Sequence, residues 1–378
     1  MKKLRYGMVG GGPESFIGDA HRRAINLDGQ AELVAGCFSR TREKCLQTGA
    51  ELNIPEDRCY SSYEEMAKCE ANRADGIDFV VVVTPNASHY PVCKAFLEAG
   101  IHVACDKPLC LTVEQAEELV ALAEEKKLLF MVTYTYMGHV TAKHIRRMIA
   151  DGKLGKIRTV MAEYPQGWLA YAGEWGGKQG QWRCDPAQSG GVNCLGDLGT
   201  HVENAVATMT GLKIRRVLAK MDTVVPGRVL DDNDVVLVEY EGGATGVYWT
   251  SQFAIGHRND LRVRIYGEND SILWSQEECE KVTVIDRDGN ITETYRGTGA
   301  IDPRAAAYGR LPSGHTEGWL ESMANLYRSF IVCIRAKADG SFLPDMVDFP
   351  TVRDGAEGIR FVHGCLASNA QGNVWVEL

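Results

Sequence analysis

The sequence predicts an α/β plus α+β protein, in which a Rossmann-type parallel sheet precedes a C-terminal domain built on a large, mainly antiparallel open sheet. A glycine-rich turn follows the first apolar run, apolar runs alternate with helical patterns through the first third, and period-two stretches dominate the rest of the chain. The 378 residues are too many for one ordinary core and suit two. We therefore expect a first domain at residues 1–137 and a second at residues 138–378.

Short apolar runs define the expected strands of the first domain, which are residues 4–9, 32–38, 79–83, 102–104 and 128–132. Between them, residues 91–98 and 113–126 carry apolar side chains at helical spacing. Thr112 with Gln115 begins the second of these helices as a capping box. This alternation predicts parallel strands that are covered by helices.

After a helix expected at residues 139–150, the apolar pattern changes to a period of two. The expected strands are residues 157–164, 214–224, 234–240, 244–252, 261–266, 271–275 and 281–286. Glu241-Gly242-Gly243 and Asp288-Gly289-Asn290 are plausible hairpin turns. Such a run favours one mainly antiparallel sheet. Helices are expected at 319–336 and 352–368, and the pattern leaves open on which domain they pack.

Composition and charge exclude several classes of protein. A formal charge of -9 argues against a nucleic-acid partner, which requires a basic surface. No apolar run is long enough to cross a bilayer, and no secretory signal precedes the first strand, so neither a membrane partner nor export is expected. The twelve cysteines are scattered singly, without Cys-x-x-Cys, which is typical of reduced thiols in a cytoplasmic protein.

The turn Gly10-Gly11-Gly12, between a strand and a helix, is the first candidate binding feature. Small residues let a backbone approach a pyrophosphate closely, and the amides of the helix start then bind it. A glycine turn alone is a weak signal, but the alternation around it strengthens this one. Because residues 13–18 delay the helix, the third small position is either Ser15 or Gly18. The expected contacts with a dinucleotide are Gly10, Gly12, Ser15, Phe16 and Ile17.

The end of the second strand bears on which dinucleotide binds. An acidic residue there would hold the ribose hydroxyls and repel a 2′-phosphate, but the chain has Ser39 and Arg40. These residues permit or favour NADP. The alternative is that Arg40 is a solvated charge at the start of a helix. The expected cofactor is therefore NAD or NADP, with the choice open.

Two further segments follow buried strands, at the carboxyl ends where ligands bind in parallel sheets. Thr84, Pro85, Asn86 and His89 follow one strand, and Asp106 and Lys107 follow the next, so all are expected near the cofactor. A surface lysine is the ordinary interpretation of Lys107. Its position between an apolar strand and Pro108 instead directs its ammonium group.

Asp197 and His201 are four residues apart in a glycine-rich region, so they share a face if the segment is helical. A carboxylate beside an imidazole raises the basicity of the imidazole, as proton transfer requires. The alternatives are a surface ion pair or a buried structural histidine. Zinc would need more ligands than this pair and Cys194 provide, so no metal is expected.

Aromatic residues accompany these polar groups. Trp168, Trp175 and Trp182 suit contact with a sugar ring, although tryptophans are equally common in cores. Trp182 and Arg183 are also expected to reach the cofactor. Further substrate contacts are expected from Tyr136 and His315, while a role for Glu317 in the pocket stays open. No cluster of basic residues suited to a phosphate is evident, which disfavours a sugar phosphate.

With the glycine turn, Thr84-Pro85-Asn86, Asp106-Lys107-Pro108, Trp182-Arg183 and Asp197-x-x-x-His201 in this order, the chain resembles the Gfo/Idh/MocA oxidoreductases over essentially its whole length. The resemblance implies NAD or NADP on the Rossmann domain and a second domain that binds a sugar, glycoside or polyol. It also implies a homo-oligomer, dimer to hexamer, formed through the open sheet. Many members have Glu where this chain has Asp106, and the turn over residues 10–18 is longer than usual.

The resemblance matches Lys107, Asp197 and His201 to the family's lysine, aspartate and histidine. It implies oxidation of a secondary ring hydroxyl in which His201 takes the proton, Lys107 stabilises the alkoxide and Asp197 orients the substrate. The first candidate reaction is oxidation at C3 of a glucosyl unit, followed by inositol oxidation. A dinucleotide-sensing regulator without turnover is the alternative of another class, and a purely structural oligomer comes last; neither would use this trio.

Overall fold

The computed structural model describes residues 2–13, 15–171 and 177–378, so Trp175 lies outside the described residues. The chain forms two compact units. One comprises Met1–Thr135 with Met323–Ala356, and the other comprises Tyr136–Ser322 with Glu357–Leu378. The two C-terminal helices, whose placement the sequence pattern left open, therefore contribute to both units.

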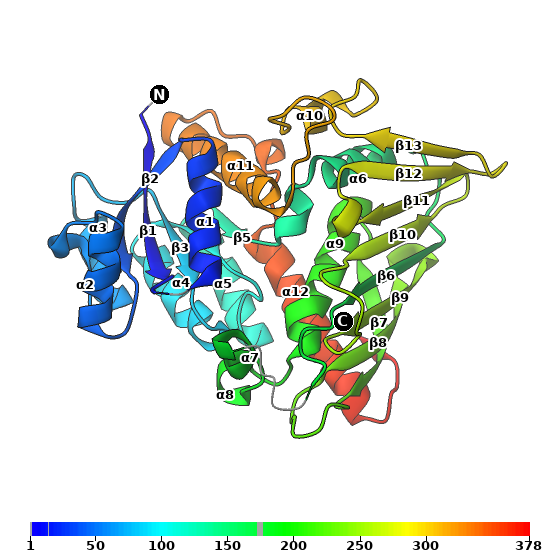
Figure 1. Ribbon diagram of the computed structural model, residues 1–378, viewed down its shortest axis with the longest axis horizontal. Coiled ribbons are helices and arrows are strands. Elements are labelled where there is room, and N and C mark those ends of the chain that lie inside the picture. Colours follow the sequence, from blue (N-terminus) through cyan, green and yellow to red (C-terminus); the bar gives the residue numbers. More distant parts are fainter. Residues whose placement is uncertain (1, 14, 172–176) are drawn as a thin grey trace. The chain divides into compact units, whose positions relative to one another are not determined.

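The first unit contains a parallel sheet with the strand order β2-β1-β3-β4-β5 (Figure 1). Its strands are β1 (Leu4–Gly10), β2 (Ala31–Cys37), β3 (Phe79–Val83), β4 (His102–Cys105) and β5 (Phe130–Val132). A parallel bridge between Gly36 and Cys59 lies beside β2, where a Rossmann sheet has a further strand. All five residues of β3 are buried, as in a sheet covered on both faces. The order of the strands reverses between β1 and β3, which is where such sheets bind ligands.

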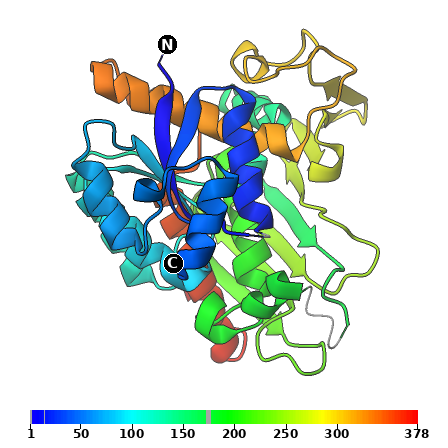
Figure 2. The same ribbon diagram turned by 60° about the vertical axis from the view of Figure 1, so that its left-hand side comes forward.

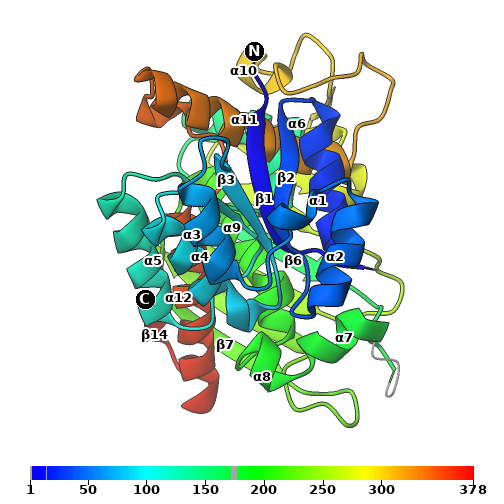
Figure 3. The same ribbon diagram turned by 90° about the vertical axis from the view of Figure 1, so that its left-hand side faces the viewer.

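Helices cover both faces of this sheet. They are α1 (Phe16–Leu27), α2 (Arg42–Glu51), α3 (Tyr63–Ala71), α4 (His89–Glu98), α5 (Val113–Glu125) and the 323–339 part of α11 (Trp319–Asp339). Figure 3 shows α3, α4 and α5 side by side, away from α1. Helix α11 crosses behind the blue strands (Figure 2), and its Phe330 meets Phe79 of β3 edge-on, with 5.6 Å between ring centroids.

The second unit is built on a nine-stranded sheet with the order β13-β12-β11-β10-β6-β9-β8-β7-β14. The strands are β6 (Thr159–Pro165), β7 (Ile214–Asp222), β8 (Asn233–Tyr240), β9 (Thr245–Ser251), β10 (Arg262–Tyr266), β11 (Asp270–Ser275), β12 (Lys281–Asp286), β13 (Ile291–Tyr295) and β14 (Val376–Glu377). Among the described strand pairs of this sheet, β6 with β9 is parallel and the others are antiparallel.

Helices α6 (Val140–Ala150), α9 (Thr200–Thr210) and the 357–370 part of α12 (Val352–Ala370) belong to this unit. Shorter helices are α7 (Gly177–Arg183), α8 (Pro186–Ser189), α10 (Pro303–Ala306) and the π-helical turn Leu195–Gly199. Apolar residues of α9 and α12 pack with the inward side chains of the sheet in one core, which includes Val202, Phe361 and Val263. Within the described part of the chain, none of the helices combines the length and apolar character needed to span a bilayer.

The predicted fold class is confirmed, and the predicted strands agree with the observed ones to within a few residues. Both hairpin turns are present, since Glu241–Gly243 joins β8 to β9 and Asp288-Gly289-Asn290 joins β12 to β13. The sequence interpretation missed β13, whose residues are mostly exposed and alternate Thr with Glu. An edge strand with a polar pattern lacks the apolar face on which the prediction relied.

Phe330→Ala is expected to lower the free energy of unfolding by about 3–5 kcal/mol, because it removes a fully buried ring from the core of the first unit. Val332→Ala on the same helix is the matched control, since Val332 is 42% exposed and little packing is lost. Chemical denaturation of the full chain measures both. Equal, small effects would contradict the placement of α11 in this core.

Candidate active site

The glycine turn of the first unit forms a tight backbone cradle at the start of α1. Gly10 and Gly11 have φ of 85° and 72°, which favour glycine. A Cβ on Gly12 would lie 2.6 Å from the Phe38 carbonyl oxygen, and a Cβ on Gly18 would lie 2.4 Å from Gly11 Cα. The third close-packed small position is therefore Gly18. Ser15 is the helix cap, whose Oγ accepts from the Gly18 N–H at 3.2 Å.

This cradle fits a dinucleotide. The N-terminus of the twelve-residue helix α1 supplies backbone N–H groups and a positive dipole beside a backbone that only small residues permit. The guanidinium of Arg22 donates to the Gly11 carbonyl at 2.9 Å and supports the turn. Phe16, which is 67% exposed, and the half-buried Ile17 begin the helix.

Ser39 and Arg40 follow β2, as expected from the sequence. Arg40 is exposed, and Ser39 Oγ accepts from the Thr41 N–H at 3.2 Å. The hydroxyl and the cation thus stand at the carboxyl end of the strand where an acidic residue would hold ribose hydroxyls.

At the carboxyl end of β3, Thr84 Oγ1 is buried and has no hydrogen-bond partner within residues 2–13, 15–171 and 177–378. Pro85 is exposed and Asn86 is buried in the short helical turn that follows. A buried, unpartnered hydroxyl at this edge is the feature expected of a group that binds a ligand, because burial without a partner is costly.

His89, which the sequence places near the cofactor, is buried between two loops. Its ring is 1% exposed, with Nδ1 2.7 Å from the Pro108 carbonyl oxygen and Nε2 2.8 Å from the Thr84 carbonyl oxygen. Both ring nitrogens thus lie within hydrogen-bond distance of backbone carbonyl oxygens, and a neutral ring donates to one of them. The side chain joins the loop after β3 to the loop after β4 and so positions both loops.

Asp106 and Lys107 follow β4. Asp106 Oδ1 accepts from Thr133 Oγ1 at 2.9 Å and from the Lys107 N–H at 3.1 Å, which fixes the carboxylate next to the lysine. His21 of α1, whose importance the sequence did not indicate, lies with Nε2 4.0 Å from Asp106 Oδ1 and Nδ1 2.5 Å from Tyr327 Oη. Burial lowers the pKa of His21, which favours a neutral ring in this chain of polar groups.

In the second unit, Asp197 lies in the π-helical turn Leu195–Gly199, and His201 follows in α9. Single π-turns are rare and often mark functional sites. Asp197 Oδ2 accepts from Arg183 Nε at 3.0 Å and from Gln252 Nε2 at 3.3 Å. The other end of the Gln252 amide accepts from Asn193 Nδ2 at 2.6 Å. The carboxylate is therefore held by a cation and an amide, both of which have fixed positions.

His201 is 7% exposed and packs against two tyrosines. Its ring centroid lies 4.8 Å from that of Tyr136 and 5.8 Å from that of Tyr164. The two phenol groups hydrogen-bond to each other, and Asn259 Nδ2 donates to Tyr136 Oη at 2.9 Å. Burial raises the pKa of both tyrosines, so both phenols stay protonated.

The tyrosine pair continues into a chain of neutral hydrogen-bonding groups. Gln166 Nε2 donates to Asn259 Oδ1 at 2.6 Å, and Trp168 Nε1 donates to Gln166 Oε1 at 2.7 Å. The Trp168 side chain is partly exposed, and the Arg183 guanidinium lies 5.9 Å from its ring and 4.3 Å from the Trp182 ring. Of the two residues expected at the cofactor, Arg183 thus pairs with Asp197, and Trp182 lies against the Arg183 guanidinium.

His315 and Glu317 are placed outside this chain of contacts. The carboxylate of Glu317 is buried and accepts from the Arg310 and Leu311 N–H groups, each at 2.6 Å, and from Arg296 Nη1 at 3.1 Å. Glu317 thus organises its own loop. The His315 side chain is exposed, and its carbonyl oxygen accepts from Arg296.

Sequence reasoning did not single out Gln166, Gln252 and Asn259. A signal was available for two of them, because Gln166 follows β6 and Gln252 follows β9 at the ends of expected strands. This signal could not identify them as neighbours, because the sequence does not show that β6 and β9 are adjacent and parallel. Asn259 lies in a loop, and nothing in its local sequence distinguishes it.

Comparisons with known proteins agree with this geometry. Residues 4–134 match a family profile described as an oxidoreductase family with an NAD-binding Rossmann fold, and residues 142–273 match the GFO/IDH/MocA C-terminal domain. The chain belongs to the Gfo/Idh/MocA oxidoreductase family. Its first unit is therefore an NAD-binding Rossmann domain, and the predicted dehydrogenase class is confirmed.

Three similar proteins illustrate the family, and two of them are named with a small molecule. YfiI, an uncharacterized oxidoreductase of Bacillus subtilis, is 39% identical over all of this chain and 97% of its own length. An inositol dehydrogenase homologue of Azotobacter vinelandii, solved with NADH and myo-inositol, is 36% identical, with a TM-score of 0.94 and coverage of 100% of this chain and 98% of its own. The levoglucosan dehydrogenase of Pseudarthrobacter phenanthrenivorans is 25% identical over 75% of this chain and 76% of its own.

Gly18→Ala is expected to weaken NADH binding at least about tenfold, or about 1.4 kcal/mol, because the added Cβ meets Gly11 backbone and must displace the turn. Gly299→Ala is the control, since a Cβ there meets nothing within 4 Å. Calorimetric titration of the full chain with NADH measures both dissociation constants. Unchanged affinity in Gly18→Ala would contradict the assignment of the cradle.

Proposed function

We propose that this NAD(P)-dependent dehydrogenase oxidises a secondary ring hydroxyl of an uncharged cyclic polyol or sugar, with an inositol as the first candidate. The observation that carries the proposal is the run of neutral donors and acceptors in the second unit, from Tyr136 and Tyr164 through Asn259 and Gln166 to Trp168. Hydroxyl and amide groups recognise several hydroxyls on one ring, and the tryptophan offers an apolar face.

The charge distribution around Asp197 supports an uncharged substrate. The guanidinium of Arg183 is paired with the Asp197 carboxylate, so the two charges offset each other. A phosphorylated sugar would instead favour a cluster of cations able to bind its oxygens. The structure bound to myo-inositol, at 36% identity, supports the ring-polyol class.

In the proposed mechanism, His201 takes the proton of the reacting hydroxyl, and the Lys107 ammonium stabilises the developing negative charge on its oxygen. Asp197 accepts a hydrogen bond from a neighbouring hydroxyl and so orients the ring. Tyr136 and Tyr164 fix the imidazole through ring contacts. The glycine cradle would hold NAD(P)⁺, which would supply the hydride acceptor for this oxidation.

Oxidation at C3 of a glucosyl unit is the second candidate, and the partly exposed face of Trp168 favours a pyranose. A dinucleotide sensor without turnover would have no use for the network that holds Asp197 and His201. Incubating the enzyme with myo-inositol, scyllo-inositol, glucose and a β-glucoside, each with NAD⁺ or NADP⁺, while following absorbance of the reduced cofactor separates these candidates. Turnover of none of them would contradict the proposal.

Lys107→Ala and His201→Ala are each expected to lower kcat by roughly a hundred- to ten-thousandfold, since each removes a proton-transfer or charge-stabilising group. The affinity for NADH is expected to change little. His257→Ala is the matched control, because His257 pairs with Asp260 in the second unit and has no proposed role. Steady-state kinetics and NADH titration check these outcomes, and normal turnover in either variant refutes its role.

Arg40→Ala tests the cofactor choice. If Arg40 binds a 2′-phosphate, the variant raises KM for NADP⁺ by about tenfold and leaves KM for NAD⁺ unchanged, because NAD⁺ lacks that group. Steady-state measurement of KM for NADP⁺ and for NAD⁺ in the wild type and the variant tests whether Arg40 binds the 2′-phosphate. An equal effect on the two cofactors would identify Arg40 as a solvated helix-start charge.

A further inference from the structure

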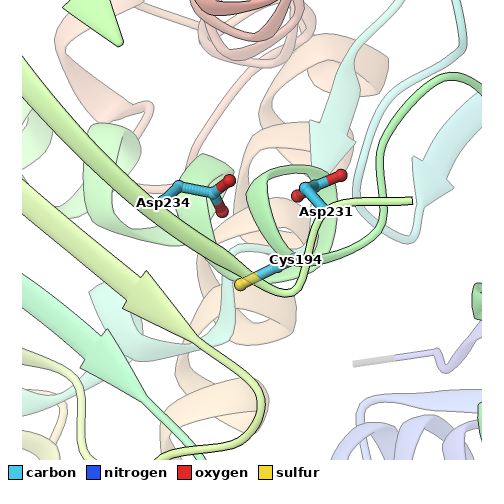
Figure 4. Close-up of side chains that lie close together, drawn as sticks. All are labelled: Cys194, Asp231 and Asp234. Atoms are coloured by element: carbon cyan, nitrogen blue, oxygen red, sulfur yellow. The ribbon is translucent and has the colours of Figure 1, made fainter. Parts of the chain in front are cut away.

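A buried group of two aspartates and a cysteine lies next to the turn that carries Asp197, because its cysteine, Cys194, immediately precedes that turn. Ligand atoms of Cys194, Asp231 and Asp234 all lie within 4.8 Å of one another, and all three residues are buried (Figure 4). Asp231 is 6% exposed and Asp234 is fully buried. Two ionised carboxylates this close in a core would be very unfavourable, because each is desolvated and repels the other.

Asp231 caps the start of the helical segment. Its Oδ1 accepts from the Asn193 N–H at 2.7 Å, its Oδ2 accepts from the Leu195 N–H at 2.6 Å, and its backbone carbonyl accepts from the Cys194 N–H at 3.2 Å. Three consecutive amides that the helix itself leaves unpaired are thus satisfied by one residue. Both carboxyl oxygens face donors, which is the environment of a carboxylate.

Asp234 has the opposite environment. Its Oδ2 accepts from Thr250 Oγ1 at 2.8 Å, while its Oδ1 is buried and meets no hydrogen-bond donor in the described part of the chain. An acceptor without a donor, beside a neighbouring carboxylate, is satisfied if it carries a proton and donates. The other titratable groups facing the pair are the thiols of Cys194 and of Cys365 on α12, neither of which supplies positive charge. The Cys194 thiol donates a weak hydrogen bond to the Asp234 carboxyl group, which opposes the effect of burial on its pKa without reversing it.

We propose that Asp234 is a protonated carboxylic acid that donates to the Asp231 carboxylate, and that this pair positions the turn bearing Asp197. Burial and the charge of Asp231 raise the pKa of Asp234 well above its usual range, in agreement with this assignment. The capped segment begins at Asn193, whose amide holds Gln252, and Gln252 in turn donates to Asp197. Asp231 and Asp234 are therefore positioning residues, an inference that rests on the proposed role of Asp197.

Asp234→Asn and Asp231→Asn test the pair, because the two substitutions have opposite consequences. An amide at position 234 keeps both contacts, since its oxygen accepts from Thr250 and its nitrogen donates to Asp231. Activity at neutral pH is then expected within about threefold of wild type. An amide at position 231 places its NH₂ group against a backbone N–H, so one of the two cap hydrogen bonds is lost. The turn that bears Asp197 is then poorly positioned, and kcat is expected to fall at least about tenfold while NADH affinity is retained.

Two measurements test the protonation of Asp234 without relying on turnover. Infrared difference spectra at neutral pH are expected to show the carbonyl stretch of a buried carboxylic acid in the wild type and not in Asp234→Asn. Because the folded pKa of Asp234 is raised, its contribution to stability is lost as pH rises toward that pKa. The free energy of unfolding should therefore fall more steeply from about pH 5 to about pH 8 in the wild type than in Asp234→Asn.

Several outcomes would overturn the proposal. They are an absent infrared band, a band that persists in Asp234→Asn, equal effects of the two asparagine variants, or a stoichiometric metal ion that chelation removes and both variants lose. If the wild type oxidises no polyol, the proposed function fails, yet the infrared and stability measurements still decide the protonation of the pair.

Discussion

The candidate site of the second unit depends on one exception in its sheet, the parallel pairing of β6 with β9. Parallel neighbours end at the same edge of a sheet, whereas antiparallel neighbours end at opposite edges. Gln166 and Gln252 follow these strands, and the Gln166 N–H donates to the Ser251 carbonyl at 2.7 Å. The Gln166 amide donates to the tyrosine pair, and the Gln252 amide donates to Asp197. The pairing of the two strands therefore places the hydrogen-bond network of the tyrosines next to that of Asp197.

The groups with proposed chemical roles are surrounded by partners that restrict their motion. Asp197 has a guanidinium and an amide, His201 has two aromatic rings, and Asp106 has a hydroxyl and a backbone amide. Catalysis benefits from such preorganisation, because little reorganisation is then needed when charge develops on the substrate. The tyrosines beside His201 stay neutral, which avoids a second negative charge near the carboxylate.

Prediction from sequence succeeded where a residue's role depends on its neighbours in the chain. The turn at Gly10, the strands of both sheets and the cap at Thr112 follow from local sterics and periodicity, and the structure contains all of them. It gave no sign of the surroundings of His89, whose two ring nitrogens lie close to carbonyl oxygens of separate loops. It also left Ser15 and Gly18 undecided, since only the approach of Gly11 to α1 distinguishes a cap from a packing position.

The sequence by itself determined most of the strands, the class of each sheet, the glycine turn and the family, because apolar periodicity and motif spacing are properties of the chain. Only the tertiary structure decided which polar groups meet. Asn193 and Gln252 are 59 residues apart, and Tyr136 and Asn259 are 123 apart, yet both pairs are hydrogen-bonded. Such partners depend on strand pairing and on the need to satisfy every buried polar group, and no local pattern records either one.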